Sequence, residues 1–406
     1  MTKIDIKKFI DIPFAKRARC VVCETPFKKP LISLPDFPLT EIYTRRPLKK
    51  RAGYLDQEFH FCENCGQGQL AHVIDKDLLY GESFSYHFRT SESLTGRDSS
   101  LFFVNFLDRV VGKKRFKTIV EVGCNDLHLL RSISDRAEKL IGIDPILKGR
   151  EKEWSRGKIV AVGDFLENID LENDIDLVIC KDTLEHVVDP KGFIQKILRK
   201  GHEDTLYFFQ FPFLETLCDG MRFDQIFHQH LNYFSLKSIL KMLDELGCEL
   251  LDHTINHNLW GSILIVFKKG RNSVKYRRSA KKLSSKEILR KYGVFQQTMD
   301  LAQKRLEEFA GTVVYGYGAA LMLPVLSYHL KNDFSGLKAI LDDDQRKAGL
   351  YYINLPVKII RRDQIADFRN AVVLITAIAT FDNVRRILKN VFELNPKQII
   401  VPMNVF

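Results

Sequence analysis

The stretch Ile119-Val-Glu-Val-Gly-Cys-Asn-Asp126 decides the fold of this 406-residue chain. An apolar strand ends there in a glycine turn that is followed by polar side chains. Three further apolar runs come at helical spacing, at residues 140–143, 175–180 and 206–211. Strands that are buried on both faces and joined by helices predict a parallel, doubly wound α/β sheet. Ligands of such sheets bind beyond the carboxyl ends of the strands.

Three positions beyond strand ends carry side chains that suit a nucleoside cofactor. Gly123 lets the backbone pass close to a ligand, and Asn125 and Asp126 can accept hydrogen bonds from an ammonium group. A carboxylate such as Asp144 can take both hydroxyls of a ribose, and the run 163–165 offers an adenine one polar and one stacking contact. The order and spacing of these groups resemble the S-adenosylmethionine site of Rossmann-like methyltransferases. The candidate cofactor-binding residues are Glu121, Gly123, Asn125, Asp126, Asp144, Gly163, Asp164, Phe165 and Lys181.

A dinucleotide-binding dehydrogenase is the alternative interpretation, because an acid about twenty residues past a glycine turn also suits NAD. Leu127 argues against it, since it stands where a glycine would let a pyrophosphate approach the helix. In the methyltransferase interpretation, the fourth strand end, Cys180-Lys-Asp-Thr-Leu-Glu-His-Val187, lies beside the reacting methyl group. Glu185 and His186 can equally cap or line the next helix.

Two Cys-x-x-Cys pairs precede this domain, with 38 residues between them. Each pair offers two thiolates one tight turn apart, and together they can complete a tetrahedron of sulfurs around zinc. The surrounding segment has many prolines and few large apolar residues, so a structural metal would supply stability that its core lacks. Redox-active dithiols and coincidence are the alternatives. Four sulfur ligands leave no open position, so we expect a structural rather than catalytic ion bound by Cys20, Cys23, Cys62 and Cys65.

The composition is that of a folded protein with a net charge of +11, which suits nucleic acid, an anionic membrane or a small polyanionic substrate. Nine Lys or Arg and no acid lie between Lys268 and Lys286, as a solvated linker or a phosphate-contacting segment. The run lacks interleaved aromatic residues, so we expect no nucleic-acid partner. Without an apolar span or a signal peptide, and with cysteines in scattered apolar contexts, the chain is expected in the cytoplasm, off the membrane.

The segment Phe223-Asp-Gln-Ile-Phe-His-Gln-His-Leu-Asn-Tyr-Phe234 holds the strongest candidates for catalysis. Two histidines at positions i and i+2 cannot share a helix face, so we expect a loop or strand with one ring pointing inward. A one-residue slip would exchange the faces of His228 and His230, so the sequence leaves their orientation open.

These motifs occur in order with Trp260-Gly-Ser262 and Val314-Tyr-Gly-Tyr-Gly-Ala-Ala320. Over essentially the whole chain, the set resembles the three-domain nucleotide-sugar C-methyltransferases, bacterial enzymes that methylate 4-keto-6-deoxy sugars carried on dTDP. The resemblance implies a class I methyltransferase domain at residues 76–270, with a zinc domain at 1–75. It also implies a basic linker, a long helix from about 285 to 310 and a Rossmann-like domain within 271–406.

The resemblance further implies S-adenosylmethionine and structural Zn²⁺ as cofactors, and a nucleotide-diphosphate sugar as the substrate. His230 corresponds to the catalytic base of the family and Tyr86 to its tyrosine upstream of the first domain junction, with His228 and Gln229 as further candidates. Where the family has Tyr-His-Glu-His, this chain has Phe227 and Gln229 in place of the phenol and the carboxylate. A glutamine cannot carry a proton to or from a substrate. O-methylation, another acceptor, or a scaffold that binds the cofactor without turnover therefore stay open.

The last domain has its own glycine-rich turn opening a helix, which can hold a phosphate by its backbone N–H groups. In the family this domain helps to hold the nucleotide-sugar. Met322 stands where the family turn often carries a lysine, so a diphosphate would rely on backbone donors or other bases. A purely structural role is the alternative. The oligomeric state is not specified by the sequence.

Overall fold

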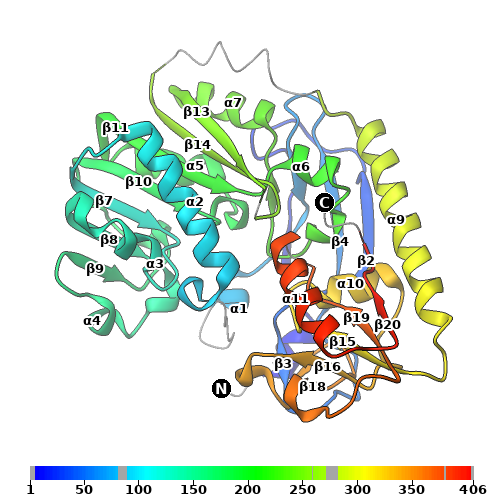
Figure 1. The fold of residues 1–406 in the computed structure, drawn as a ribbon. Coiled ribbons are helices and arrows are strands. Elements are labelled where there is room, and N and C mark those ends of the chain that lie inside the picture. The colour runs from blue at the N-terminus through cyan, green and yellow to red at the C-terminus, as the bar shows by residue number, and fades with distance from the viewer. Residues whose placement is uncertain (1–4, 81–88, 258, 271–281, 379–380, 404–406) are drawn as a thin grey trace.

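The computed structural model describes residues 5–80, 89–257, 259–270, 282–378 and 381–403. Tyr86 and most of the basic run after Lys268 lie outside the described residues. Figure 1 shows a large α/β sheet on one side and the N-terminal strands behind helix α9 on the other. The C-terminal domain, in orange and red, lies beneath them.

The central sheet has seven strands in the order β13-β14-β11-β10-β7-β8-β9. The five strands from β11 to β9 pair in parallel, which confirms the predicted doubly wound core. β14 is antiparallel to both of its neighbours, so the sheet is mixed rather than wholly parallel. β13 and β14 follow each other closely in the chain, and a short connection can join only antiparallel strands. The bounds are β7 Phe116–Val122, β8 Ala137–Ile143, β9 Ile159–Val162, β10 Ile175–Lys181, β11 Gly201–Phe211, β13 Cys248–Asn256 and β14 Ser262–Lys269.

Successive residues of a strand point to opposite faces of the sheet, and here the residues on both faces are apolar. Helices therefore cover both faces. Ile119 packs with α2 (Leu94–Val111) and α3 (His128–Ser132) in one apolar cluster. Val120 belongs to the cluster of the other face, with α5 (Pro190–Leu198) and α7 (Leu236–Glu245). The cysteines of the two Cys-x-x-Cys pairs join this second cluster, so the metal-binding turns lie against the sheet domain. Shorter helices are α1 (Lys76–Tyr80), α4 (Glu151–Trp154) and α6 (Leu214–Asp219).

The N-terminal segment is built of short strands. Among residues 5–75 the only helical element is a 3₁₀ turn at Ile6–Phe9. β1 (Phe14–Lys16) pairs with β6 (His72–Ile74), and β2 (Ile32–Pro38), β4 (Tyr54–Phe61) and β5 (Gly68–Leu70) form an antiparallel sheet. β12 (Asn232–Tyr233), which lies between β11 and β13 in the chain, pairs antiparallel with β5 and extends this sheet. This pairing carries the two-histidine segment onto the N-terminal sheet.

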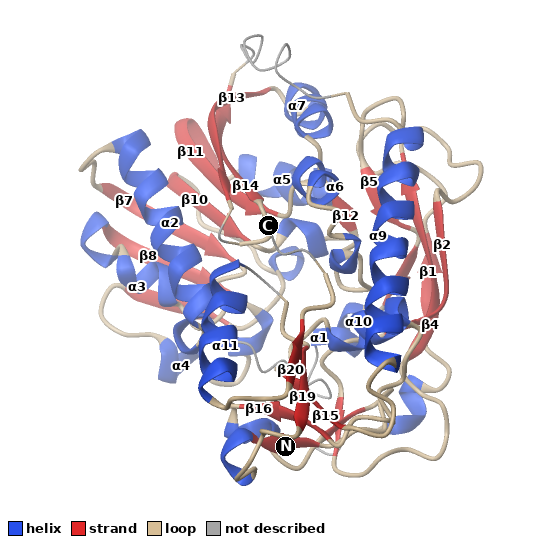
Figure 2. Cartoon of the chain, turned by 45° about the vertical axis from the view of Figure 1, so that its right-hand side comes forward, coloured by secondary structure: helices blue, strands red, loops and turns tan. Residues whose placement is uncertain are grey.

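The C-terminal segment begins with the long helix α9 (Ser285–Glu307), close to the predicted range. Its five-stranded sheet is parallel throughout, in the order β18-β16-β15-β19-β20. β17 (Tyr351–Tyr352) pairs with β3 (Tyr43–Thr44) of the N-terminal segment. Figure 2 shows α9 standing beside α10. The remaining bounds are β15 Val313–Tyr317, β16 Ala339–Asp342, β18 Ile359–Arg361, β19 Ala371–Ile375, β20 Gln398–Ile400, α10 Leu323–Leu330 and α11 Phe381–Glu393.

Candidate active site and metal centre

The four cysteines of the two Cys-x-x-Cys pairs meet in one cluster, with every sulfur within 4.8 Å of the others. The two closest sulfur pairs are 3.5 Å apart. Zinc–sulfur bonds of about 2.3 Å in a tetrahedron would place sulfurs about 3.8 Å apart. The donor set therefore fits zinc, and it leaves no position for a substrate. These ligands are Cys20, Cys23, Cys62 and Cys65.

The glycine turn after β7 lies directly against the turn after β10. Gly123 has φ +77°, and a Cβ placed on it would lie 1.9 Å from the Oγ1 atom of Thr183. Only glycine fits this position without strain. Glu121, at the end of β7, is buried, and its Oε2 atom has no hydrogen-bond partner among the described residues. Burial raises the pKa of Glu121 well above its ordinary value.

Asp144, beyond β8, is hydrogen-bonded to the same turn. Its Oδ2 accepts from the backbone N–H of Asn125 at 2.8 Å and its Oδ1 from that of Ile146 at 3.0 Å. Burial raises the pKa of Asp144 to about 6, although these two bonds favour the charged form. Asp126 accepts from the backbone N–H of Ser91 at 2.9 Å through Oδ2, while its buried Oδ1 has no partner among the described residues. Two buried acceptors at one strand edge, on Glu121 and Asp126, fit a cofactor that brings an ammonium group and hydroxyls.

The remaining predicted cofactor residues lie at the same edge of the sheet. A Cβ on Gly163 would lie 2.4 Å from the backbone of Lys148, so this glycine lets two loops pack closely. Asp164 accepts hydrogen bonds from the backbone of Phe165 and from Asn168, at 2.7 and 2.8 Å. Lys181, at the end of β10, forms a 2.5 Å ion pair with Asp182. Their assignment to the cofactor stays a prediction.

The two histidines of the 223–234 segment have different surroundings. His228 is fully buried, with Nε2 3.1 Å from the carbonyl oxygen of Phe37 and Nδ1 3.2 Å from the side-chain amide of Gln57. A carbonyl can only accept, so Nε2 carries the proton and Nδ1 accepts from the amide. Burial lowers the pKa of His228 to about 4. Both ring nitrogens are thus committed to the N-terminal sheet, which favours a positioning role for this histidine.

His230 instead faces the end of β10. Its ring lies 4.9 Å from the ring of His186 and 4.1 Å from that of Phe227, measured between centroids. The ring is 3% exposed, and its Nδ1 has no hydrogen-bond partner among the described residues. Burial, with a smaller effect of His186, lowers the pKa of His230 well below 6.5, so the ring is neutral at pH 7. A buried, neutral imidazole with an open nitrogen can accept a proton from a bound molecule.

Hydrogen bonds from the side chains of Asn232 and Arg17 hold the segment after His230 against the loop that follows β10. The side chain of Asn232 donates to the carbonyl oxygens of Leu184 and Val187 at 3.2 and 2.7 Å. Arg17, from the N-terminal segment, donates to the carbonyl oxygen of Val188 at 2.6 Å and to the side chain of Asn232 at 3.1 Å. Burial lowers the pKa of Arg17 to about 10, which still leaves it charged at neutral pH. The sequence analysis missed both residues, although Asn232 lies only two positions after His230.

Gln229 points to a different neighbour from His230. Its side-chain amide exchanges hydrogen bonds with the hydroxyl of Thr40 at 3.0 and 3.2 Å. Its backbone carbonyl oxygen is 2.7 Å from Nδ1 of His186. The glutamine thus links the N-terminal segment to the site and positions His186 through its main chain.

The glycine turn of the C-terminal domain is partly occupied by the protein itself. The backbone N–H of Ala319 donates to Asp342 at 2.6 Å, so one turn donor is already used. Lys347 donates to the carbonyl oxygen of Ala319 at 2.8 Å and lies 4.0 Å from Asp342. The sequence analysis missed this lysine, which places a positive charge at the turn where Met322 offers none.

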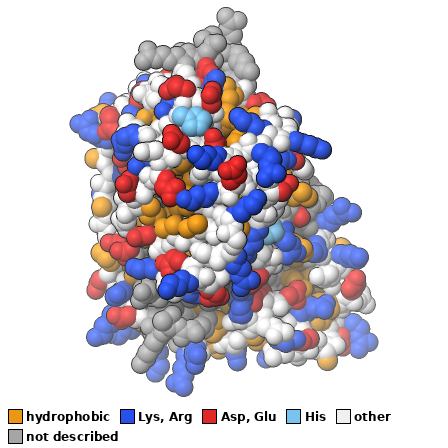
Figure 3. Space-filling view, turned by 90° about the vertical axis from the view of Figure 1, so that its left-hand side faces the viewer, with side chains coloured by type: hydrophobic (Ala, Val, Ile, Leu, Met, Phe, Trp, Pro, Cys, Tyr) orange, Lys and Arg blue, Asp and Glu red, His pale blue; other side chains and the backbone are white. Residues whose placement is uncertain are grey.

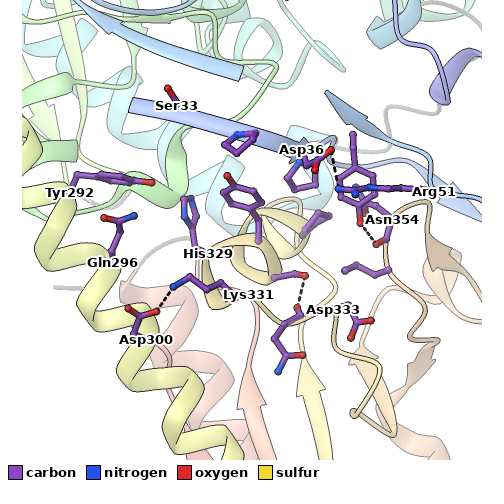
Figure 4. Close-up of a pocket in the computed structure, with 18 residues that line it drawn as sticks. Ser33, Asp36, Arg51, Tyr292, Gln296, Asp300, His329, Lys331, Asp333 and Asn354 are labelled. Atoms are coloured by element: carbon purple, nitrogen blue, oxygen red, sulfur yellow. Dashed lines mark hydrogen bonds and ion pairs between the residues drawn. The ribbon is translucent and has the colours of Figure 1, made fainter. Parts of the chain in front are cut away.

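A cavity of about 570 Å³ lies elsewhere, between β2, α9 and α10, and Figure 4 shows it. Several of its charges are paired: Asp36 with Arg51 at 3.1 Å and Lys331 with Asp300 at 2.8 Å. None of the predicted site residues lines it. On the face in Figure 3, Lys and Arg are interspersed with Asp and Glu. Among the described helices, none combines the length and apolar character of a bilayer span.

Two family models match the chain. The model "Methyltransferase domain" matches residues 98–253, and the model "Putative zinc binding domain" matches residues 20–80. With the seven-stranded sheet, the first match establishes a class I, S-adenosylmethionine-dependent methyltransferase domain of Rossmann-like α/β fold. The second, with the four-cysteine cluster, supports zinc in the N-terminal segment.

Two curated proteins are similar to parts of the chain. The C-methyltransferase NovU of Streptomyces niveus is 25% identical over 212 residues, which cover 51% of this chain and 49% of NovU. The ubiquinone biosynthesis O-methyltransferase of Nitrosomonas europaea is 29% identical over 105 residues, covering 24% and 44%. The chain thus spans about half the length of the curated relatives it matches.

Among solved structures, the N-methyltransferase NodS of Bradyrhizobium japonicum, in complex with S-adenosylhomocysteine, is 12% identical with a TM-score of 0.34. The match covers 44% of this chain and 89% of NodS. A methyltransferase bound to the Trm112 activator of Haloferax volcanii gives 11% identity and a TM-score of 0.38, with 43% of this chain and 92% of the other covered.

Proposed function

We propose that this chain, which fits the family of S-adenosylmethionine-dependent C-methyltransferases with a zinc-binding domain, methylates a carbon of a nucleotide-linked 4-keto-deoxy sugar. One observation carries the proposal. The predicted cofactor turn at Gly123 packs against Thr183. Two and three residues after Thr183 come Glu185 and His186, whose side chains cluster with that of His230. A candidate cofactor edge and a candidate base therefore share one site.

His230 is the proposed base. A ketone acidifies the proton on the neighbouring sugar carbon, and a neutral imidazole with an open nitrogen can remove that proton. The electron pair left behind makes an enolate, whose carbon is the nucleophile. S-adenosylmethionine supplies an activated methyl group, which it gives up with the bonding electrons staying on sulfur. Alignment of the two bound reactants and stabilisation of the enolate oxygen would supply most of the acceleration.

The surrounding residues act on position and charge. Asp144, Glu121 and Asp126 would hold the cofactor through its hydroxyls and its ammonium group. Burial holds the pKa of His230 well below its ordinary value, so the substrate must be placed with its acidic proton directly at the open nitrogen. Tyr86, which lies outside the described residues, stays the tyrosine that the resemblance assigns to this site.

The other two domains would bind and support rather than react. The turn at Gly318 with Lys347 is the proposed contact for the nucleotide diphosphate, because a lysine can neutralise phosphate charge. The zinc cluster keeps the N-terminal sheet folded against the site. The proposed setting of the enzyme is deoxysugar biosynthesis in the cytoplasm, where the thiols of its eight cysteines would stay reduced.

Methyl transfer to oxygen is the second candidate. It is favoured by Gln229 in place of a carboxylate and by the partial similarity to an O-methyltransferase. A panel of 4-keto-6-deoxy sugar nucleotides incubated with S-adenosylmethionine separates the two. Fragment mass spectra should place the new methyl group on a ring carbon. A methyl group found on oxygen, or no transfer to any sugar, would reject the proposal.

A further inference from the structure

We propose that Glu185, His186 and His230 form a second metal site, which binds a divalent transition-metal ion such as Zn²⁺ or Co²⁺. One ligand atom from each of the three side chains lies within 4.8 Å of the others. Two imidazoles and a carboxylate are a ligand set that such ions accept, with bonds of about 2.0–2.2 Å. Nitrogen and oxygen donors also distinguish this cluster from the four-sulfur site.

Two of the three ligands are buried, and each has one side-chain atom without a hydrogen-bond partner among the described residues. Glu185 is 1% exposed and its Oε2 atom is unpartnered, as is Nδ1 of His230 at 3% exposure. Leaving such atoms unsatisfied in a protein interior is unfavourable. An ion bound by this cluster would give the buried carboxylate and the buried imidazole a charged partner.

The third ligand is held in the orientation that metal binding needs. Nδ1 of His186 lies 2.7 Å from the carbonyl oxygen of Gln229, so this nitrogen carries the proton. Its Nε2 then presents a lone pair, 3.9 Å from Oε1 of Glu185. Histidines that ligate metals usually donate their other N–H to a carbonyl or carboxylate in this way. The clamp of Asn232 on the loop carbonyls fixes the backbone of the same segment.

The cluster can also be reached from outside. The side chain of His186 is 27% exposed, while that of Glu185 is 2% exposed. An ion can therefore enter past His186 and exchange its bound water molecules for the buried protein ligands. Three protein ligands leave at least one coordination position open.

The ion would take the nitrogen lone pair that His230 needs as a base, so it would inhibit methyl transfer. This consequence rests on the proposed function, whereas binding of the ion does not. Free divalent metal ions would therefore regulate the methyltransferase site by inhibition.

The test is a titration of the zinc-loaded full-length protein with Co²⁺, followed by its absorption spectrum. We expect one bound equivalent with weak visible bands and without the intense sulfur-to-cobalt absorption of a thiolate site. Glu185→Gln and His186→Gln should each weaken this binding by at least about tenfold, since even outer-shell changes cost that much. Glu215→Gln, which removes a buried carboxylate outside the cluster, should leave it unchanged.

The proposal is overturned if the wild type binds no such equivalent, or if binding persists in both cluster variants. X-ray absorption of the cobalt-loaded wild type decides the matter without variants, because a nitrogen and oxygen shell supports the site and an all-sulfur shell overturns it. With a working acceptor, the transfer rate should fall as the site fills. An unchanged rate would remove the inhibition, and failure to methylate any sugar would refute the proposed function while the binding result stands.

Discussion

Replacing Gly123 by alanine tests whether the contact between the β7 and β10 turns shapes the cofactor edge. The residue has φ +77°, and its new Cβ would lie 1.9 Å from Thr183 Oγ1 and 2.9 Å from Thr183 Cβ. A left-handed conformation costs a residue with a Cβ roughly 1–2 kcal/mol. The steric overlap adds about 1–3 kcal/mol, the usual cost of overpacking. We therefore expect Gly123→Ala to lower the free energy of unfolding by about 2–5 kcal/mol and to weaken S-adenosylmethionine binding.

Gly149→Ala is the matched control. Gly149 has φ +78° but no neighbour within 4 Å of the added Cβ. Gly149→Ala should therefore lower the free energy of unfolding only through the left-handed backbone conformation. Both substitutions reduce the freedom of the unfolded chain equally, so this effect cancels between them. Urea unfolding can be followed by tryptophan fluorescence, because Trp154 and Trp260, the only two tryptophans, both lie in the methyltransferase segment.

A Thr183→Ala background isolates the overlap. There the cost of Gly123→Ala should shrink toward that of Gly149→Ala, although the closest remaining contact stays at 2.9 Å. Equal costs for the two glycine substitutions, or a Gly123→Ala cost that Thr183→Ala does not change, would refute the close contact between the two turns.

The other predictions concern the histidines, the cofactor carboxylate and the metal. His228→Gln should lower the free energy of unfolding by roughly 1–3 kcal/mol because it leaves buried partners unsatisfied, whereas His230→Gln should cost less in urea unfolding and abolish transfer; the reverse pattern would exchange their roles. S-adenosylmethionine affinity measured by calorimetry should fall as the pH drops through about 6, where Asp144 takes up a proton, and Asp144→Asn should bind weakly without this dependence. Because the pKa of Asp144 is raised from 3.8 on folding, its contribution to stability is greatest below pH 3.8 and is lost as the pH rises through about 6. Chelation of zinc should lower the melting temperature of the wild type, and a melting curve that chelators leave unchanged would contradict a structural metal.

Local sequence signals predicted four strands of the methyltransferase sheet, β7, β8, β10 and β11. The strand before Gly123 and the runs at 140–143 and 175–180 are buried on both faces of the sheet. A strand of this kind appears in the sequence as an almost unbroken apolar run, which can be recognised without knowledge of its neighbours. The Cys-x-x-Cys pairs likewise come together as their chemistry requires. The antiparallel strand β14 was not predicted, since an apolar run carries no information about its direction.

The candidate site depends on long-range contacts that a sequence pattern does not encode. The pairing of β12 with β5 decides that His228 turns to Phe37 and Gln57 while His230 turns to His186. Residues two apart on a strand would share one face, whereas residues 228 and 229 form a turn before β12, so the two rings diverge. The same pairing explains why the partners of Arg17 lie more than 160 residues away in the chain.

The most direct test of the account is proton exchange at the sugar carbon next to the ketone. The 4-keto sugar nucleotide that accepts methyl would be incubated in deuterated water with S-adenosylhomocysteine, which cannot donate a methyl group, and followed by nuclear magnetic resonance. We expect deuterium uptake at that carbon with wild-type protein and with folded His228 variants, and loss of uptake with His230→Gln. Uptake that survives His230→Gln, or no uptake by a wild type that methylates the same sugar, would contradict His230 as the base that forms the enolate.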